Sequence, residues 1–125
     1  PEGVAVLNAS DPVAVSFEEL SDGDVFFYSH EENHPVIAAA REKQQRVVFY
    51  QDEQIFFAQG NTLVSMLKTS AEQIQSLMKE SGISLSTLCA AVATAKALDI
   101  SPDLIRAGLK SFQNAGMELS KTGAH

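Results

Sequence analysis

The chain has 125 residues, and its 9 Lys and Arg against 16 Asp and Glu give a net charge of −7 with neutral histidines. This length fits a single domain that can bury a core without metal or disulfides, and one cysteine excludes an internal disulfide framework. An acidic chain without clustered Lys and Arg disfavours nucleic-acid and acidic-membrane partners. No apolar run reaches the ~18–20 residues of a membrane span, and no basic-then-apolar leader pattern opens the chain. We therefore expect a cytoplasmic protein with no nucleic-acid or membrane partner.

The first half has the pattern of strands alternating with helices. A strand buried on both faces is expected over Val4–Asn8, because a short apolar run there is closed by turn residues. Asp11 and Pro12 are a helix cap and a first helical residue, which predicts a helix to about Leu20. A second strand, Asp24–Tyr28, and a helix from Pro35 to about Gln45 follow.

The middle of the chain has a different pattern. Three β-rich runs separated by short polar turns predict an antiparallel meander over Arg46–Tyr50, Gln54–Ala58 and Thr62–Leu67. Ser70 and Gln73 form a capping-box pattern, which predicts a helix ending at Gly82.

The last third predicts a pair of helices. In the first, the apolar residues Leu85, Leu88, Cys89, Val92 and Leu98 fall close to one stripe. Ser101 and Pro102 restart a helix that should end near Gly116, with its inward residues at Leu104, Ile105, Leu109 and Phe112. The fold class expected for residues 1–125 is one α/β domain whose mixed sheet joins a short parallel βαβ part to an antiparallel meander and a C-terminal helix pair.

One segment matches the sequence pattern of a zinc-protease motif. His30 to His34 match H-E-x-x-H, which binds zinc when both histidines share one helical face. His34 precedes Pro35, and a residue before proline is driven out of the helical conformation. A solvated turn is the expected structure, a zinc protein is the weakest alternative, and no metal ligand is assigned.

Other reactive residues have ordinary structural interpretations. Cys89 lies on an apolar stripe without a nearby histidine and is expected to be a small buried side chain. Arg41, Lys43 and Arg46 suit an anion contact, but they are also typical of a solvated helix end. The glycine positions form no phosphate-binding loop. No catalytic residue is assigned, and the chain alone is not expected to be an active enzyme.

Asn8 and Asp11 are the best candidates for ligand contact. In an open α/β sheet, ligands bind beyond the carboxyl ends of the strands, where these residues would lie. The alternative is local: Asp11 caps the following helix, and Asn8 holds the turn. Both interpretations stay open at this stage.

Two segments resemble the central domain of the Mur ligase family. Val4–Pro12 (VAVLNASDP) resembles the family segment AVLNADDP, with Asp11 at its second Asp and Ser10 at its first. Ala90–Phe112 looks like the closing helix pair, LAA…ALGI…IR.GL.SF. The Mur-like part of cyanophycin synthetases is the most similar. Many Mur ligases also carry G-H-N-x-x-N, whose side chains hold the nucleotide base, but here only Gly82 matches it.

The resemblance implies that this chain, which begins with Pro1, is the second half of an ATP-binding domain cut from a longer enzyme. The intact parent would be an ATP- and Mg²⁺-dependent amide-forming ligase acting on a small-molecule or peptide-like substrate. For cyanophycin synthetase-like enzymes, this is an aspartate-based polymer that accepts arginine. Asn8 and Asp11 would line the cofactor cleft, and the phosphate loop, metal ligands and catalytic lysine would lie outside this chain, so that no cofactor binds it strongly alone.

A second hypothesis is a non-catalytic interaction or structural domain that has kept the ligase scaffold and lost the nucleotide pocket. Ile83, Ser84 and Thr87, which follow Gly82, are compatible with it. In either case, an uncovered sheet edge is expected to lead to self-association, so a homo-oligomer is a further expectation.

Overall fold

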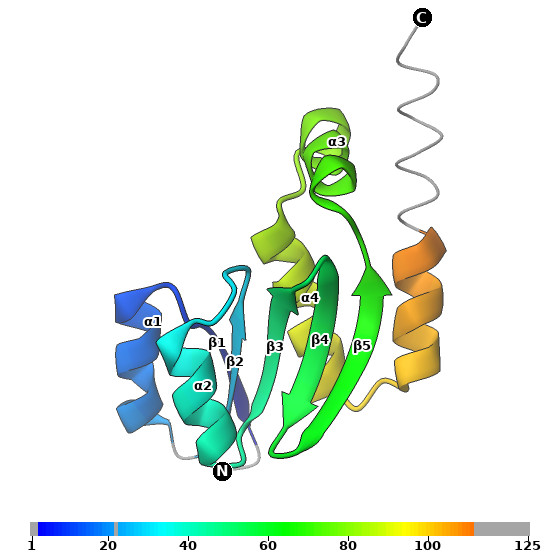
Figure 1. The fold of residues 1–125 in the computed structure, drawn as a ribbon. Coiled ribbons are helices and arrows are strands. Elements are labelled where there is room, and N and C mark those ends of the chain that lie inside the picture. The colour runs from blue at the N-terminus through cyan, green and yellow to red at the C-terminus, as the bar shows by residue number, and fades with distance from the viewer. Residues whose placement is uncertain (1–2, 22, 112–125) are drawn as a thin grey trace, which may run out of the picture.

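The computed structural model describes residues 3–21 and 23–111. They form a five-stranded sheet with helices on both faces (Figure 1). The strands lie side by side in chain order: β1 (Val4–Asn8), β2 (Asp24–Ser29), β3 (Arg46–Gln51), β4 (Gln54–Gln59) and β5 (Thr62–Lys68). β1, β2 and β3 are parallel, and β3, β4 and β5 are antiparallel. The predicted α/β class with a mixed sheet is therefore confirmed.

The helices fall into two layers. α1 (Pro12–Ser16), continued by a 3₁₀ turn, η1 (Phe17–Leu20), joins β1 to β2, and α2 (Pro35–Glu42) joins β2 to β3. After the meander come α3 (Ala71–Ser81), α4 (Leu85–Ala97) and a helical segment over residues 102–111. α1 and α2 lie on one face of the sheet and α4 on the other (Figure 1).

Local sequence signals explain where the helices start and stop. The N–H groups of Val13 and Ala14 donate to Asp11 Oδ1 at the start of α1. At α3, both hydrogen bonds of the capping box between Ser70 and Gln73 are present. Gly82 ends α3 with φ +71°, a left-handed conformation that glycine adopts without strain.

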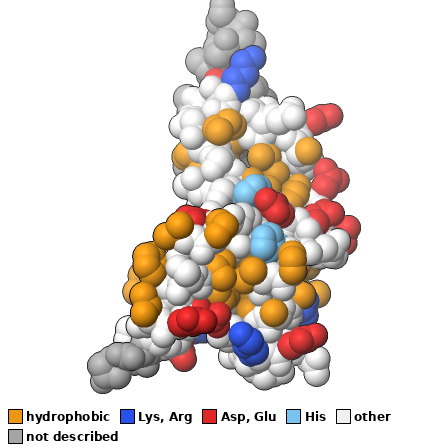
Figure 2. Space-filling model, turned by 90° about the vertical axis from the view of Figure 1, so that its left-hand side faces the viewer, with side chains coloured by type: hydrophobic (Ala, Val, Ile, Leu, Met, Phe, Trp, Pro, Cys, Tyr) orange, Lys and Arg blue, Asp and Glu red, His pale blue; other side chains and the backbone are white. Residues whose placement is uncertain are grey.

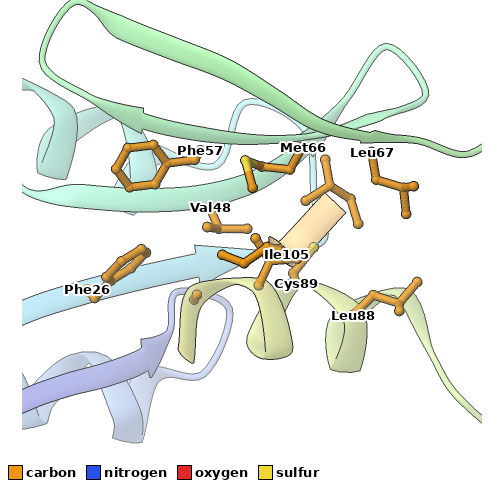
Figure 3. Packing of buried hydrophobic residues seen from close by; sticks show 11 residues of the cluster. Phe26, Val48, Phe57, Met66, Leu67, Leu88, Cys89 and Ile105 are labelled. Atoms are coloured by element: carbon orange, nitrogen blue, oxygen red, sulfur yellow. The ribbon is translucent and has the colours of Figure 1, made fainter. Parts of the chain in front are cut away.

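The core is divided between the two faces of the sheet, because successive side chains of a strand point to opposite sides. Phe26 is fully buried in the cluster between the sheet and α4. Figure 3 shows this cluster, where Cys89 of α4 and Ile105 of the last helix meet the strand residues. Phe27 is 1% exposed and belongs to the second cluster, under α1 and α2. The central strands are thus buried on both faces.

Three expectations about burial need correction. β1 has only Leu7 buried, because it is an edge strand, although its side chains reach both clusters. Leu98 ends α4 as its C-terminal capping residue and is 70% exposed instead of continuing the buried stripe. Leu104 is 65% exposed, while Ile105 is 7% exposed. Neighbours on a helix point about 100° apart, so the two cannot both face the sheet. Phe112 and Gly116 lie outside the described residues.

Candidate functional site at the carboxyl ends of the parallel strands

The parallel half of the sheet brings three chain segments to one edge. β1, β2 and β3 end at the same side, with Asn8 paired to Tyr28 and Tyr28 paired to Val48. In sheets of this kind, ligands bind outside the carboxyl ends of the strands. The loops after β1 and β2 therefore contain the candidate site.

Asn8 and Asp11 both support the loop after β1. The Ser10 N–H donates to Asn8 Oδ1 (2.9 Å), and the Asp11 N–H donates to the Asn8 carbonyl oxygen (3.1 Å). The capping role of Asp11 is confirmed, since its Oδ1 accepts the bonds from Val13 and Ala14. Among the described residues, Asp11 Oδ2 accepts no hydrogen bond. Capping therefore leaves one oxygen of this exposed carboxylate available to a ligand.

Two buried polar atoms at the same edge have no hydrogen-bond partner among the residues that the structure describes. Ser10 Oγ and His30 Nδ1 are shielded from solvent and make no hydrogen bond to any described residue. Asn8 and Tyr28 are the last residues paired between β1 and β2, and Ser10 and His30 each follow them by two positions, so they lie at corresponding points of neighbouring strands. A buried polar group without a partner typically costs about 1–3 kcal/mol. Both atoms are therefore ready to bond to a group from outside the described chain. No local sequence pattern indicates this burial, because it depends on neighbours that are distant in the chain.

Tyr28 is a further polar residue near this edge. Burial, as the largest cause, and then electrostatic interactions with Cys89 and Asp11 raise the pKa of Tyr28 above its ordinary value of 10.0. The hydroxyl consequently keeps its proton at neutral pH and can act as a hydrogen-bond donor. Its electrostatic coupling to Asp11 links it to the loop after β1.

The H-E-x-x-H segment does not form a zinc-protease helix. Residues 30–33 form a bend and a turn, and His34 is extended (φ −65°, ψ 130°). The Val36 N–H donates to His34 Nδ1 (3.2 Å), so His34 caps α2. Its Nε2 lies 4.0 Å from Glu31 Oε2, with its side chain only 16% exposed. The predicted turn is therefore confirmed, and its residues 31–33 are exposed, whereas His30 and His34 at its two ends are partly buried. The described part of the chain holds no group of three or more metal-binding side chains.

Cys89 is a packing residue, as predicted. It is fully buried, and burial raises the pKa of its thiol to about 12. A thiol with this pKa stays protonated at neutral pH, whereas the thiolate is the nucleophilic form.

The three basic residues near α2 do not form a joint anion site. Arg41 lies over the Phe49 ring, Lys43 is 3.8 Å from Glu18, and Arg46 pairs with Asp24 at 3.7 Å. The interpretation as a merely solvated helix end is wrong for Arg46, whose side chain is 20% exposed. Lys43 and Arg46 border a hollow of about 370 Å³ at the amino ends of the strands. Gln45 Oε1, from a residue lining this hollow, is also buried without a hydrogen-bond partner among the described residues. The charged groups of the hollow pair with one another, whereas the opposite edge has two such atoms on neighbouring strands, so we favour the opposite edge as the ligand site.

No model of a known protein family matches the chain, and neither does any curated protein sequence. Among the described residues, no helix combines the length and apolar character needed to cross a membrane.

Proposed function

We propose that this chain is part of an ATP-dependent amide-forming ligase and that its β1–β2 carboxyl edge contacts the bound nucleotide. The observation that supports a ligand at this edge is a pair of buried atoms, Ser10 Oγ and His30 Nδ1, for which the described part of the chain supplies no hydrogen-bond partner. The choice of ATP rests on the resemblance of Val4–Pro12 and Ala90–Phe112 to the Mur ligase central domain.

In the proposed reaction, a substrate carboxylate attacks the γ-phosphate of ATP and releases ADP. The amine of the second substrate attacks the acyl phosphate, and phosphate leaves as the amide bond forms. Within this chain, Asn8 shapes the loop, and the Asp11 oxygen not used for capping contacts the ligand. Residues outside the chain would hold Mg²⁺, so this chain alone catalyses no turnover. The parent is proposed to be cytoplasmic and to act on a small-molecule or peptide-like substrate.

A non-catalytic scaffold is the second candidate, and one contact favours it. In the Mur ligases, the segment before the first closing helix holds the base. Here Ser84 Oγ accepts the N–H of Thr87 (3.1 Å), and the two hydroxyl oxygens lie 3.0 Å apart. These side chains cap α4, which starts at the same end of the sheet (Figure 1). The Ser84 and Thr87 hydroxyls thus stabilise the start of α4, at the position where the Mur ligases bind the nucleotide base.

Titration with Mg·ATP, followed by amide NMR of the 125-residue chain, separates the two candidates. For a nucleotide site, the amides of residues 8–11 and of His30 shift saturably, while Mg²⁺ alone moves none of them. Ser10→Ala should weaken the response at His30. Ser81→Ala on α3, whose hydroxyl bonds only to the Leu77 carbonyl oxygen (2.8 Å), is the matched control. Shifts that are absent, or that are equal with Mg²⁺ alone, favour the scaffold.

A further inference from the structure

The two edges of the sheet differ in how they are protected. Beyond β5, the helix of residues 102–111 lies beside the strand (Figure 1), and Arg106 Nε donates to the Ser65 carbonyl oxygen (3.4 Å). The pairing of β5 with β4 also contains an irregularity at Ile55 and Phe56. Covering helices, long cations and irregular pairing all hinder a strand of another chain from adding to an edge.

β1 lacks these protections. Its five residues, Val-Ala-Val-Leu-Asn, include no charge and no proline, and its register with β2 is regular. Within the described ranges, no strand pairs with its outer side. An uncharged, regular edge strand presents unpaired N–H and C=O groups that readily pair with another strand.

An apolar stripe lies on α1 and η1, and α1 packs against β1. Val13, Phe17 and Leu20 are 64%, 49% and 76% exposed, and their spacing of four and three residues places them on one side of α1 and η1. The neighbouring residues Ala14 and Val15 face the core instead. Figure 2 views the molecule from the side of α1 and shows hydrophobic side chains along one rim. Three large apolar side chains thus remain exposed on the segment that follows β1, and no described strand pairs with the outer side of β1.

We propose that a second copy of the chain covers this surface, with β1 pairing antiparallel to β1 of the partner across a two-fold axis normal to the sheet. An antiparallel edge is complementary to itself, because both strands exchange the same donors and acceptors. An axis in this direction keeps both α1 helices on one face and brings the two stripes together. One interface therefore pairs the outer side of β1 and covers the apolar stripe. Its two-fold symmetry is the most common among homo-oligomers.

Charge is compatible with this contact although the chain carries −7. β1 and α1 contain no charged residue, so pairing of the two strands brings no like charges together. η1 carries two acidic residues, Glu18 and the exposed Glu19. Glu18, which adjoins the stripe, is already bound by Gln45 Nε2 (3.0 Å) and lies 3.8 Å from Lys43 Nζ. One short strand and one short stripe make a small interface, and interfaces below about 1,200 Å² are usually weak. We therefore expect a weak, reversible dimer.

The test is sedimentation velocity on the 125-residue chain from about 10 µM to about 1 mM, a span over which mass action would shift such a dimer. The expected result is a monomer that becomes a dimer. Leu20→Lys should lower the dimer affinity at least about tenfold, because a charge on the stripe would lose its water in the contact. Leu104→Lys, at a 65% exposed leucine near the opposite edge, is the matched control and should change nothing. Circular dichroism verifies that both variants fold.

Hydrogen exchange tests the strand pairing directly. At concentrations where the dimer forms, amides within Val4–Asn8 should become more slowly exchanging than in dilute protein. A constant monomer mass overturns the proposal. So does a dimer that Leu20→Lys leaves intact, one that both variants weaken equally, or one without added protection of β1. Open-ended growth beyond a dimer contradicts the two-fold axis.

Discussion

Two serines at the same edge of the sheet lead to opposite predictions for one substitution, Ser→Ala. Ser29 is fully buried, and its Oγ accepts the Glu31 N–H (3.0 Å) and donates to the Glu31 carbonyl oxygen (3.4 Å). Ser10 Oγ is buried without a partner among the described residues. The substitution therefore removes hydrogen bonds at one position and an unsatisfied polar atom at the other.

The magnitudes follow from that difference. Ser29→Ala leaves the Glu31 N–H without its acceptor and should lower the free energy of unfolding by about 1–3 kcal/mol. Ser10→Ala breaks no bond to the protein and relieves the desolvation of the hydroxyl, so it should be neutral or stabilising by up to ~1 kcal/mol. With a urea m-value of roughly 1–3 kcal/mol/M, a gap of 2 kcal/mol separates the unfolding midpoints by about 0.7–2 M.

Urea unfolding of the three proteins, followed by circular dichroism, measures these midpoints. If Ser10→Ala destabilises the chain as much as Ser29→Ala, then Ser10 Oγ has a hydrogen-bond partner in solution. The reasoning that this edge awaits an external ligand would then fail.

Other substitutions test local features of the fold. Asp11→Ala should lower the free energy of unfolding by about 1 kcal/mol through the lost cap, with Asp11→Asn close to wild type in the same urea assay. Gly82→Ala should lower the free energy of unfolding by about 1 kcal/mol through backbone strain alone, because φ is +71° and the added methyl group meets open space. Gly108→Ala, in the helix of residues 102–111 and also facing open space, should raise the free energy of unfolding by about 0.5–1 kcal/mol. Thermal melts should therefore show a lower melting temperature for the first variant and a higher one for the second. Because the pKa of Cys89 is about 12 when folded and 9.0 when unfolded, the unfolded state loses its proton first, so stability should fall between pH 9 and 12 by up to about 1.4 kcal/mol per pH unit. Cys89→Ala should have a flatter profile over this interval, and an identical slope would contradict the assignment.

Much of the architecture follows from short stretches of sequence. Asp11 and Pro12 start α1, Ser70 with Gln73 starts α3, and Gly82 ends it, because each of these residues acts on backbone groups a few positions away. The β-rich runs between polar turns likewise gave the strands of the meander and their antiparallel order. Asn8 and Asp11 could be placed at a strand end for the same reason, and their turn and cap hydrogen bonds followed.

Local sequence patterns did not predict which side chains are buried at the ends of helices. A helical stripe continued past Ala97 places Leu98 inward, but the helix stops there and Leu98 faces solvent. Leu104 and Ile105 have the same local pattern, and only the position of the sheet decides that Ile105 is the one buried. The partly buried histidines at 30 and 34 were missed because the strand ends and α2 that cover them are brought together by the fold.

The order of strands and helices, their caps and turns, and the buried role of Cys89 follow from sequence, since they depend on local backbone chemistry and hydrophobic pattern. The exposure of Val13, Phe17 and Leu20, and the lack of a hydrogen-bond partner for Ser10 Oγ and His30 Nδ1 among the described residues, are properties of the folded molecule. The same holds for the outer side of β1, with which no described strand pairs. Exposure and hydrogen-bond satisfaction are set by whichever groups fold against an atom, and for these residues the groups come from distant parts of the chain.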